Sequence, residues 1–155
     1  MYGPDTAAVA TPIGLVVIEG DHRSVRSIRF HPSGDARAGS TLTVREAAAQ
    51  VAAYFAGELT VFDLLLAPAA TWRGEALRQA MVDVGYGTTA GYGEIAARIG
   101  SSARALGQAC ARNPFPLVVP CHRVLQAGGV LGPYSAGEGP KTKRWLLDFE
   151  ASKAG

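Results

Sequence analysis

The stretch Val118–Val124, with the sequence Val-Val-Pro-Cys-His-Arg-Val, constrains this chain more than any other. Val118 and Val119 form an apolar pair that predicts a short buried strand. Pro120 fixes its own φ and has no N–H for a further ladder bond, so the chain must turn at Cys121. We therefore expect a thiol held rigidly at the end of a strand, beside a cleft.

The neighbours of Cys121 favour a reactive thiol. Only the thiolate is a strong nucleophile, and the imidazole of His122 can take the thiol proton directly or through one water. Arg123 adds a positive charge that we expect to favour the thiolate. The alternative is a cysteine that packs as a small hydrophobic residue beside a histidine placed there by coincidence. The motif alone leaves both interpretations open.

Composition indicates a globular chain. Its 155 residues suffice for one domain or two small ones, and 48% of them are hydrophobic. No apolar run approaches a membrane span and the N-terminus lacks the plan of a signal peptide, so we expect a cytoplasmic protein. Cys110 and Cys121 are too few for a disulfide scaffold and lack zinc-ligand spacing. Because the three histidines do not cluster with them either, we predict no metal.

The charges are distributed unevenly. A net charge of +2 permits nucleic-acid binding without requiring it. Acidic residues are common in the N-terminal part, whereas the C-terminal half is rich in basic residues and predicts a face that can meet phosphates. These basic residues are Arg98, Arg104, Arg112, Arg123, Lys141, Lys143 and Arg144.

The N-terminal part predicts a small α/β domain over residues 1–68, with a supporting role. Three alternating segments predict an antiparallel sheet, and a helix with one apolar face follows and ends at Gly57. The expected elements are strands at Thr6–Ala10, Leu15–Glu19 and Val25–Phe30, a helix at Thr41–Ala56 that buries Val44, Ala48, Val51, Ala52 and Phe55, and a short strand at Leu64–Ala67. Residues 68–70 read as a linker, so a second domain covers residues 71–155.

The second domain predicts a helix-turn-helix. Tyr92–Ile99 and Ala103–Arg112 predict two helices, joined by a tight turn at Gly100–Ser102. An ordinary packed helical hairpin is the alternative, but the position directly before the cysteine motif favours DNA binding. Two further helices are expected, at Gly74–Val84 and at Lys141–Glu150, the last with Trp145, Leu146 and Phe149 buried.

Three motifs in a fixed order resemble a known family. They are Tyr86-Gly87-Thr88-Thr89, Tyr92-Gly93-Glu94-Ile95-Ala96 and the run from Asn113 to Val124. Together they resemble the 6-O-alkylguanine-DNA alkyltransferases, also called methylated-DNA:protein-cysteine methyltransferases, well over residues 72–150 and loosely before them. The resemblance implies an α+β fold: an N-terminal ribonuclease-H-like antiparallel sheet with a helix, and a C-terminal, mainly helical, winged-helix-like domain.

The same resemblance implies a DNA repair protein. It would bind double-stranded DNA through the minor groove, flip out an alkylated guanine and transfer the alkyl group irreversibly to its own Cys121. Each molecule would act once, as a monomer and without a cofactor, because the protein itself is the acceptor. Acceptance of 4-O-methylthymine and cooperative binding along DNA stay open.

Individual roles are implied as well. Cys121 would be the alkyl acceptor, His122 a base that acts through a water, Glu150 the carboxylate that orients it, and Asn113 a brace for the turn. The implied DNA-binding residues are Tyr92, which helps rotate the nucleotide out, Arg104, which fills the gap in the base stack, and Ser102, Ala105 and Arg112. The implied pocket residues are Val124, Tyr134, Ser135, Ala136 and Lys143.

Two other functions compete with this one. A non-catalytic alkyltransferase-like protein would bind alkylated DNA without transfer, but such proteins lack the acceptor cysteine that this chain has. A thiol hydrolase or peroxidase would use the same Cys/His/Glu relay, and the helix-turn-helix argues against it. The chain also departs from the family at Gly85, Gly91 and Ala136, where the family mostly has proline, serine and glycine. These departures bear on affinity and substrate range rather than on the relay.

Overall fold

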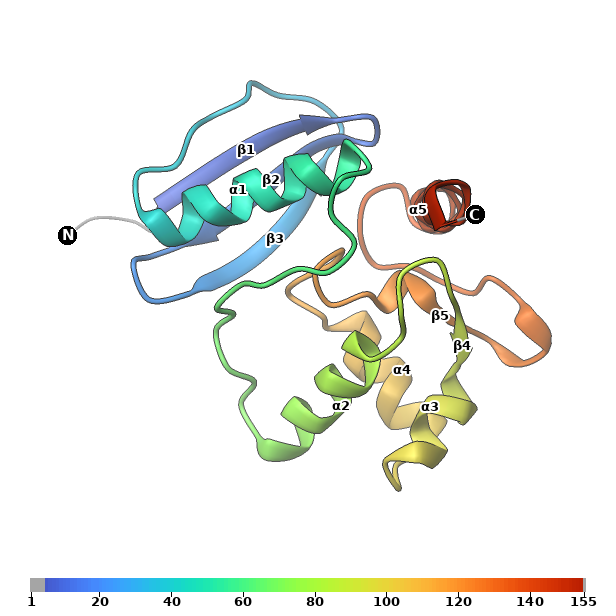
Figure 1. The fold of residues 1–155 in the computed structure, drawn as a ribbon. Coiled ribbons are helices and arrows are strands. Elements are labelled where there is room, and N and C mark those ends of the chain that lie inside the picture. Colours follow the sequence, from blue (N-terminus) through green and yellow to red (C-terminus); the bar gives the residue numbers. More distant parts are fainter. Residues whose placement is uncertain (1–4, 155) are drawn as a thin grey trace. The chain divides into compact units, whose positions relative to one another are not determined.

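The computed structural model describes residues 5–154 and has an α+β fold made of two compact units (Figure 1). The first unit extends to Ala67 and the second begins at Pro68. None of the helices between residues 5 and 154 combines the length and the apolar character that a membrane span requires.

The first unit is a three-stranded antiparallel sheet with one helix packed on it (Figure 1). Strands β1 (Asp5–Thr11), β2 (Gly14–Gly20) and β3 (Val25–His31) follow one another in the sheet, as predicted. Gly14 closes the two-residue turn between β1 and β2 with a φ of +107°, a conformation that favours glycine. Helix α1 (Leu42–Phe55) starts where the side chain of Thr41 accepts a hydrogen bond from the Val44 N–H.

The buried face of α1 differs from the predicted one. Tyr54 is fully buried, whereas Phe55, which was expected in the core, is only half-buried. The Tyr54 ring stacks on Phe62 with centroids 5.6 Å apart, so Tyr54 is the aromatic residue of α1 that the first unit buries. The buried residues of α1 are Val44, Ala47, Val51 and Tyr54.

The prediction of a strand at Leu64–Ala67 was wrong. This segment meets β3 at a single parallel bridge, in which Val25 donates to the Leu65 carbonyl and accepts from the Ala67 N–H, both at 2.8 Å. The Leu65 side chain is 70% exposed. The pairing therefore ends after one residue, and the apolar run adds little to the core.

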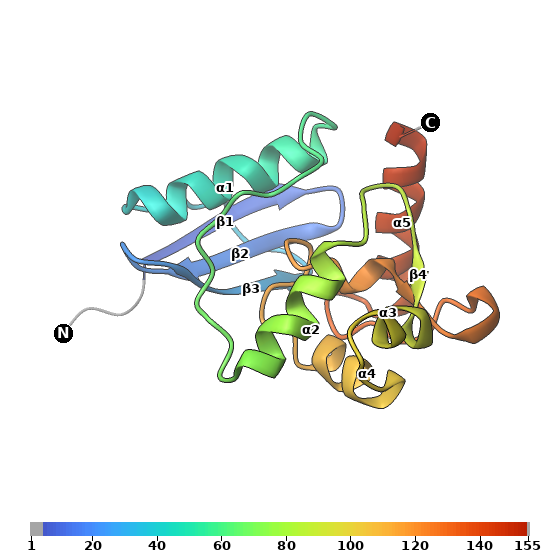
Figure 2. The same ribbon diagram turned by 60° about the horizontal axis from the view of Figure 1, so that its bottom comes forward.

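The second unit arranges helices around the cysteine motif (Figures 1 and 2). Helices α3 (Tyr92–Arg98) and α4 (Ala103–Ala111) are the two helices predicted around the tight turn, and the Ser102 hydroxyl accepts from the Ala105 N–H at 3.1 Å to start α4. The elements are α2 (Trp72–Val82), β4 (Ala90–Gly91), α3 (Tyr92–Arg98), α4 (Ala103–Ala111), the single turn η1 (Cys121–Arg123), β5 (Val124–Leu125), the single turn η2 (Ala127–Gly129) and α5 (Pro140–Ala154). β4 and β5 pair in parallel.

The prediction of a strand at Val118–Val119 was also wrong. The chain turns here: the Val119 N–H donates to the Phe115 carbonyl at 2.9 Å, and Leu117 adopts a φ of +80°. Prolines at positions 114, 116 and 120 lack the N–H groups that a ladder needs, so the segment cannot pair as a strand. Cys121 therefore begins a turn of 3-10 helix instead of ending a strand.

α5 is longer than predicted and buries a different face. It continues to Ala154, and its buried residues are Thr142, Lys143, Leu146 and Glu150. Trp145 and Phe149 stack on each other with centroids 5.0 Å apart and remain half-buried. The buried face thus contains two charged side chains, which must find partners inside the unit.

Candidate active site

Asn113 connects the turn to the sulfur of Cys121. Its side-chain amide donates to the Val119 carbonyl at 2.9 Å and to the Cys121 Sγ at 3.3 Å, while its Oδ1 accepts from the Phe115 N–H at 2.9 Å. Cys121 itself is 3% exposed. One side chain thereby fixes three points of the loop and the direction of the thiol.

His122 and Glu150 form a buried hydrogen-bonded pair. The His122 Nε2 lies 2.8 Å from a carboxylate oxygen of Glu150, and both side chains are 0% exposed. Because an ionised carboxylate can only accept, Nε2 bears the proton and Nδ1 keeps a lone pair. Nδ1 is buried and has no hydrogen-bond partner among the described residues. The pair thus orients an imidazole whose basic nitrogen is the one away from Glu150.

Arg123 also donates to the Glu150 carboxylate. Its Nε donates to Glu150 at 2.8 Å and one terminal nitrogen donates at 3.0 Å, while the other donates to the Val84 carbonyl at 2.8 Å. The Gly87 N–H donates to Glu150 at 3.3 Å. The expectation that the Arg123 charge favours the thiolate of Cys121 is therefore wrong, because this guanidinium neutralises Glu150.

Burial controls the titration of the site. Burial raises the pKa of the Cys121 thiol, although the hydrogen bond from Asn113 and the charge of Lys143 lower it in part. Burial lowers the pKa of His122 against the opposing effect of Glu150. For Glu150, burial alone would raise the pKa, but hydrogen bonds from His122 and Arg123 lower it well below its usual range. At neutral pH the site thus holds a thiol, a neutral imidazole and a carboxylate.

A small pocket of about 130 Å³ lies over the sulfur. Cys121 lines it together with Tyr92 at the start of α3 and with Tyr134 and Ser135 of the loop before α5. One face of α4 supplies another wall with Gly107, Cys110 and Ala111, and Pro133 completes the lining. Four residues predicted for the site are therefore brought together around one cavity.

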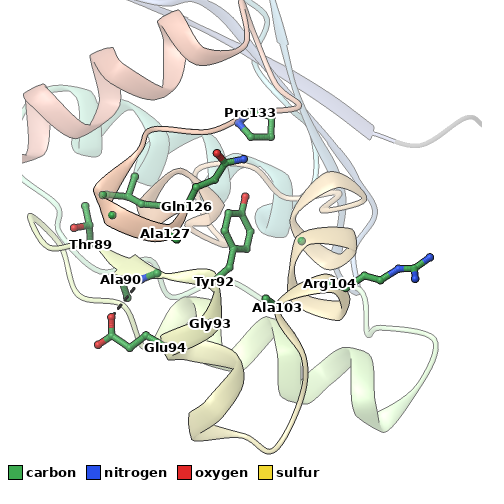
Figure 3. Close-up of a pocket in the computed structure, with 15 residues that line it drawn as sticks. Thr89, Ala90, Tyr92, Gly93, Glu94, Ala103, Arg104, Gln126, Ala127 and Pro133 are labelled. Atoms are coloured by element: carbon green, nitrogen blue, oxygen red, sulfur yellow. Dashed lines mark hydrogen bonds between the residues drawn. The ribbon is translucent and has the colours of Figure 1, made fainter.

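A larger cavity of about 900 Å³ adjoins this pocket (Figure 3). Tyr92, Gly107 and Pro133 line both cavities. Figure 3 shows the Tyr92 ring standing between the segment that follows β5 and the start of α4, while the Arg104 side chain extends outward from α4. The pocket at the sulfur thus opens beside a groove that α4 borders.

Lys143 holds the loop that forms the pocket roof. Its buried ammonium donates to the Val124 carbonyl at 2.7 Å and to the Pro133 carbonyl at 3.3 Å, and burial lowers its pKa. Lys143, Val124 and Ala136 do not line the 130 Å³ pocket themselves. The Val124 carbonyl, predicted to accept from a substrate amine, accepts from Lys143 in this structure.

The other predicted DNA-binding residues lie on different sides of α4. Ser102 is exposed as the N-cap of this helix. Ala105 and Arg112 line a different groove, next to α2. The sequence analysis missed Arg123 as a Glu150 partner, and it missed Cys110 as a pocket wall. The spacing of Gly107, Cys110 and Ala111 on one helical face was the available signal for the latter.

Comparisons with known proteins agree over nearly the whole chain. The family model for the DNA binding domain of 6-O-methylguanine DNA methyltransferase matches residues 74–152. The methylated-DNA–protein-cysteine methyltransferase of Methanosarcina acetivorans is 38% identical over 94% of this chain and 97% of its own, and that of Mycobacterium bovis is 38% identical over 94% and 92%. The crystal structure of Mycobacterium tuberculosis OGT in complex with DNA is similar with a TM-score of 0.80, at 36% identity over 94% of this chain and 92% of that one. The chain therefore belongs to the methylated-DNA–protein-cysteine methyltransferase family.

Proposed function

We propose that Cys121 is the acceptor in the transfer of an alkyl group from the 6-oxygen of guanine in double-stranded DNA. The sulfur attacks the alkyl carbon, a C–S bond forms and the C–O bond breaks. The thiol proton ends on the guanine that leaves, so the products are an S-alkylcysteine and unmodified guanine. A thioether has no easy route back to a thiol, so each molecule reacts once and no cofactor takes part.

The observation that supports this mechanism best is the 2.8 Å hydrogen bond between Glu150 and His122, the residue that follows Cys121 in the sequence; all three residues are buried. Because burial raises the pKa of the thiol, the resting protein needs a base at the moment of transfer. His122 Nδ1 has the lone pair for this role and acts through one water, while Glu150 stabilises the imidazolium that results.

The burial of Cys121 requires that the modified base leave the duplex. A thiol that is 3% exposed cannot reach an alkyl group inside the base stack, so the nucleotide must rotate out of the duplex. We assign Tyr134 and Ser135 to the walls that receive the base, because both line the pocket with Cys121. Lys143 positions this loop through the Pro133 carbonyl, and Tyr92 lies at the junction of the pocket and the groove.

DNA binding is assigned to the α3–α4 pair. Arg104 at the exposed start of α4 is placed to enter the duplex where the base has left, since its planar guanidinium can stack there. Entry from the minor groove with mostly phosphate contacts predicts little sequence preference and binding that weakens with salt. The solved structure of the Mycobacterium tuberculosis relative in complex with DNA supports DNA binding by this chain.

Intact mass measurement tests the proposal. The protein is incubated with duplex DNA bearing one 6-O-methylguanine, and we expect a mass gain of one methylene, located at Cys121 by peptide analysis and absent in Cys121→Ser. Cys110→Ser is the matched control and should keep the gain. Binding of the modified duplex without a mass gain would instead identify a non-catalytic alkylated-DNA binding protein, and a gain at Cys110 would contradict the assignment of the acceptor.

A further inference from the structure

The loop from Pro133 to Gly139 supplies one wall of the pocket at the sulfur but has no regular structure of its own. Tyr134 and Ser135 in this loop line the pocket, and α5 begins only at Pro140. Gly137 and Gly139 have φ values of +56° and +65°, a conformation that favours glycine and that leaves the unrestrained chain many alternatives. Contacts from outside the loop must therefore keep this wall in place.

Lys143 fixes the beginning of the loop. Its ammonium donates to the Pro133 carbonyl at 3.3 Å and to the Val124 carbonyl at 2.7 Å, and the side chain is fully buried. Both of these carbonyls precede Tyr134 in the sequence. The ammonium thus determines where the loop starts, and the segment that follows Ser135 needs a contact of its own.

Thr142 makes that contact at the other end of the loop. It is only 5% exposed, and its hydroxyl accepts from the Glu138 N–H at 2.9 Å. The Gly139 N–H donates to the Ala136 carbonyl at 3.1 Å, so the turn that carries Glu138 is closed on itself. The hydroxyl therefore joins the whole turn to the first part of α5. A valine has the same shape as threonine but no acceptor for this N–H.

We propose that Thr142 is a positioning residue for alkyl transfer, whose hydroxyl holds the end of the loop so that Tyr134 and Ser135 form a firm wall for the extruded base. Thr142 acts through these two residues, because it does not line the 130 Å³ pocket itself. The inference rests on the proposed function, since it concerns the reception of the same base. Without the hydroxyl the wall loosens, and the alkyl carbon stands in line with the Cys121 sulfur for a smaller fraction of the time.

Thr142→Val and Thr142→Ser test the role of the hydroxyl. Methyl transfer from a duplex with one 6-O-methylguanine is followed by rapid quench and intact mass at saturating DNA. We expect the rate to fall by about three- to ten-fold in Thr142→Val, the effect of one neutral hydrogen bond, and to recover in Thr142→Ser, which keeps the hydroxyl. The affinity for DNA, measured by fluorescence anisotropy, should stay unchanged. The pH profile of the rate should also keep its shape, because threonine does not titrate.

Hydrogen exchange followed by mass spectrometry observes the loop directly. In Thr142→Val we expect faster exchange of the amides of residues 134–139 and wild-type exchange in the helices of the second unit. Thr43→Val is the matched control, because it removes a hydroxyl that donates to the His22 carbonyl in the first unit. This control should change neither the rate nor the exchange of the loop.

Three outcomes would overturn the proposal: a wild-type rate in Thr142→Val, a Thr142→Ser protein as slow as Thr142→Val, or a loss of DNA affinity large enough to account for the slower transfer. Wild-type exchange of the loop in Thr142→Val would also overturn it. Failure of the proposed function is read separately, as wild-type protein that binds the duplex but gains no mass on Cys121. The exchange measurement needs no reaction, so it decides even then whether Thr142 holds the loop.

Discussion

Glu150 is the residue on which the geometry of the site depends most. Glu150→Gln keeps the shape of the side chain but removes its negative charge and replaces one of its two acceptor oxygens by an NH2 donor, which must then face His122 or Arg123. We expect the rate of single-turnover methyl transfer to fall by about 10³-fold, as when a triad carboxylate becomes an amide. We also expect a loss of about 3 kcal/mol in the free energy of unfolding, because Arg123 stays buried without its partner.

Rates are measured by rapid quench and intact mass, and stability by urea unfolding. Asp148→Asn is the matched control, since it makes the same change on an exposed side of α5 beside Arg144. A Glu150→Gln protein that transfers methyl groups at the wild-type rate would remove Glu150 from the relay.

Cys110 is the largest of the three α4 side chains that form the pocket wall. Burial raises its pKa to about 12, so it remains a neutral thiol and acts by its volume. Cys110→Met should leave methyl transfer nearly unchanged but slow reaction with free 6-O-benzylguanine by about ten-fold or more, since a pocket wall discriminates by this much per added group. Cys110→Ser, of similar volume, is the control. Equal effects on both substrates would show that position 110 does not limit the pocket.

The sequence predicted which residues form the site better than it predicted which side chains they contact. The adjacency of Cys121 and His122 singled out the thiol, and the family resemblance brought in Glu150 from 28 positions away. Nothing in the spacing showed that Arg123 turns toward Glu150 instead of the thiol. Its direction is set by partners that lie far away in the sequence, the Glu150 carboxylate of α5 and the Val84 carbonyl.

Among the elements, the turn from Asn113 to Pro120 determines where the thiol stands. Leu117 holds a φ of +80°, which costs about 1 kcal/mol for a residue with a side chain, and the Asn113 hydrogen bonds hold the same loop. Asn113→Ala should lower the free energy of unfolding by about 1–3 kcal/mol, because the Val119 carbonyl and the Phe115 N–H lose their partner. It should slow transfer by about 10²-fold, because a displaced thiol no longer meets the alkyl carbon in line.

Gln79→Ala, which removes an exposed amide from α2, is the control for this substitution. The free energy of unfolding and the transfer rate are interpreted together. A loss of stability with an unchanged rate, measured with free 6-O-benzylguanine, would show that Asn113 only stabilises the fold. A loss of rate without the loss of stability would assign it to the thiol alone.

Elements with a clear period were predictable, and those defined by long-range contacts were not. β1, β2, β3 and the α3–α4 pair follow from alternation, helical spacing and capping residues such as Ser102. The supposed strand at Val118–Val119 failed because apolar character alone does not supply the N–H groups that three nearby prolines remove. The buried face of α5 was misjudged because aromatic residues were assumed to be buried before charged ones, whereas Lys143 and Glu150 have specific partners inside the unit.

The whole molecule should lose stability in acid because of the buried relay. The pKa of His122 in the folded protein lies below its ordinary value of 6.5, so the unfolded chain binds more protons as pH falls below 6.5. The contribution of His122 is fully present above pH 6.5 and is lost as pH falls toward its folded pKa. The pKa of Glu150 is also lowered, from 4.5, so its contribution is complete above that pH and is lost as pH falls further. Both groups therefore act in the same direction, in two successive pH ranges.

Urea unfolding at a series of pH values from about 8 to about 4 measures this dependence. Just below pH 6.5 we expect the free energy of unfolding to fall by up to about 1.4 kcal/mol per pH unit, the effect of one proton. His122→Asn should flatten this first range, and Glu150→Gln the second, while His31→Asn, which changes an exposed histidine at the end of β3, should alter neither. If His122→Asn unfolds with the same pH dependence as the wild type, the imidazole is not a buried neutral base, and the transfer mechanism would need another proton acceptor for the Cys121 thiol.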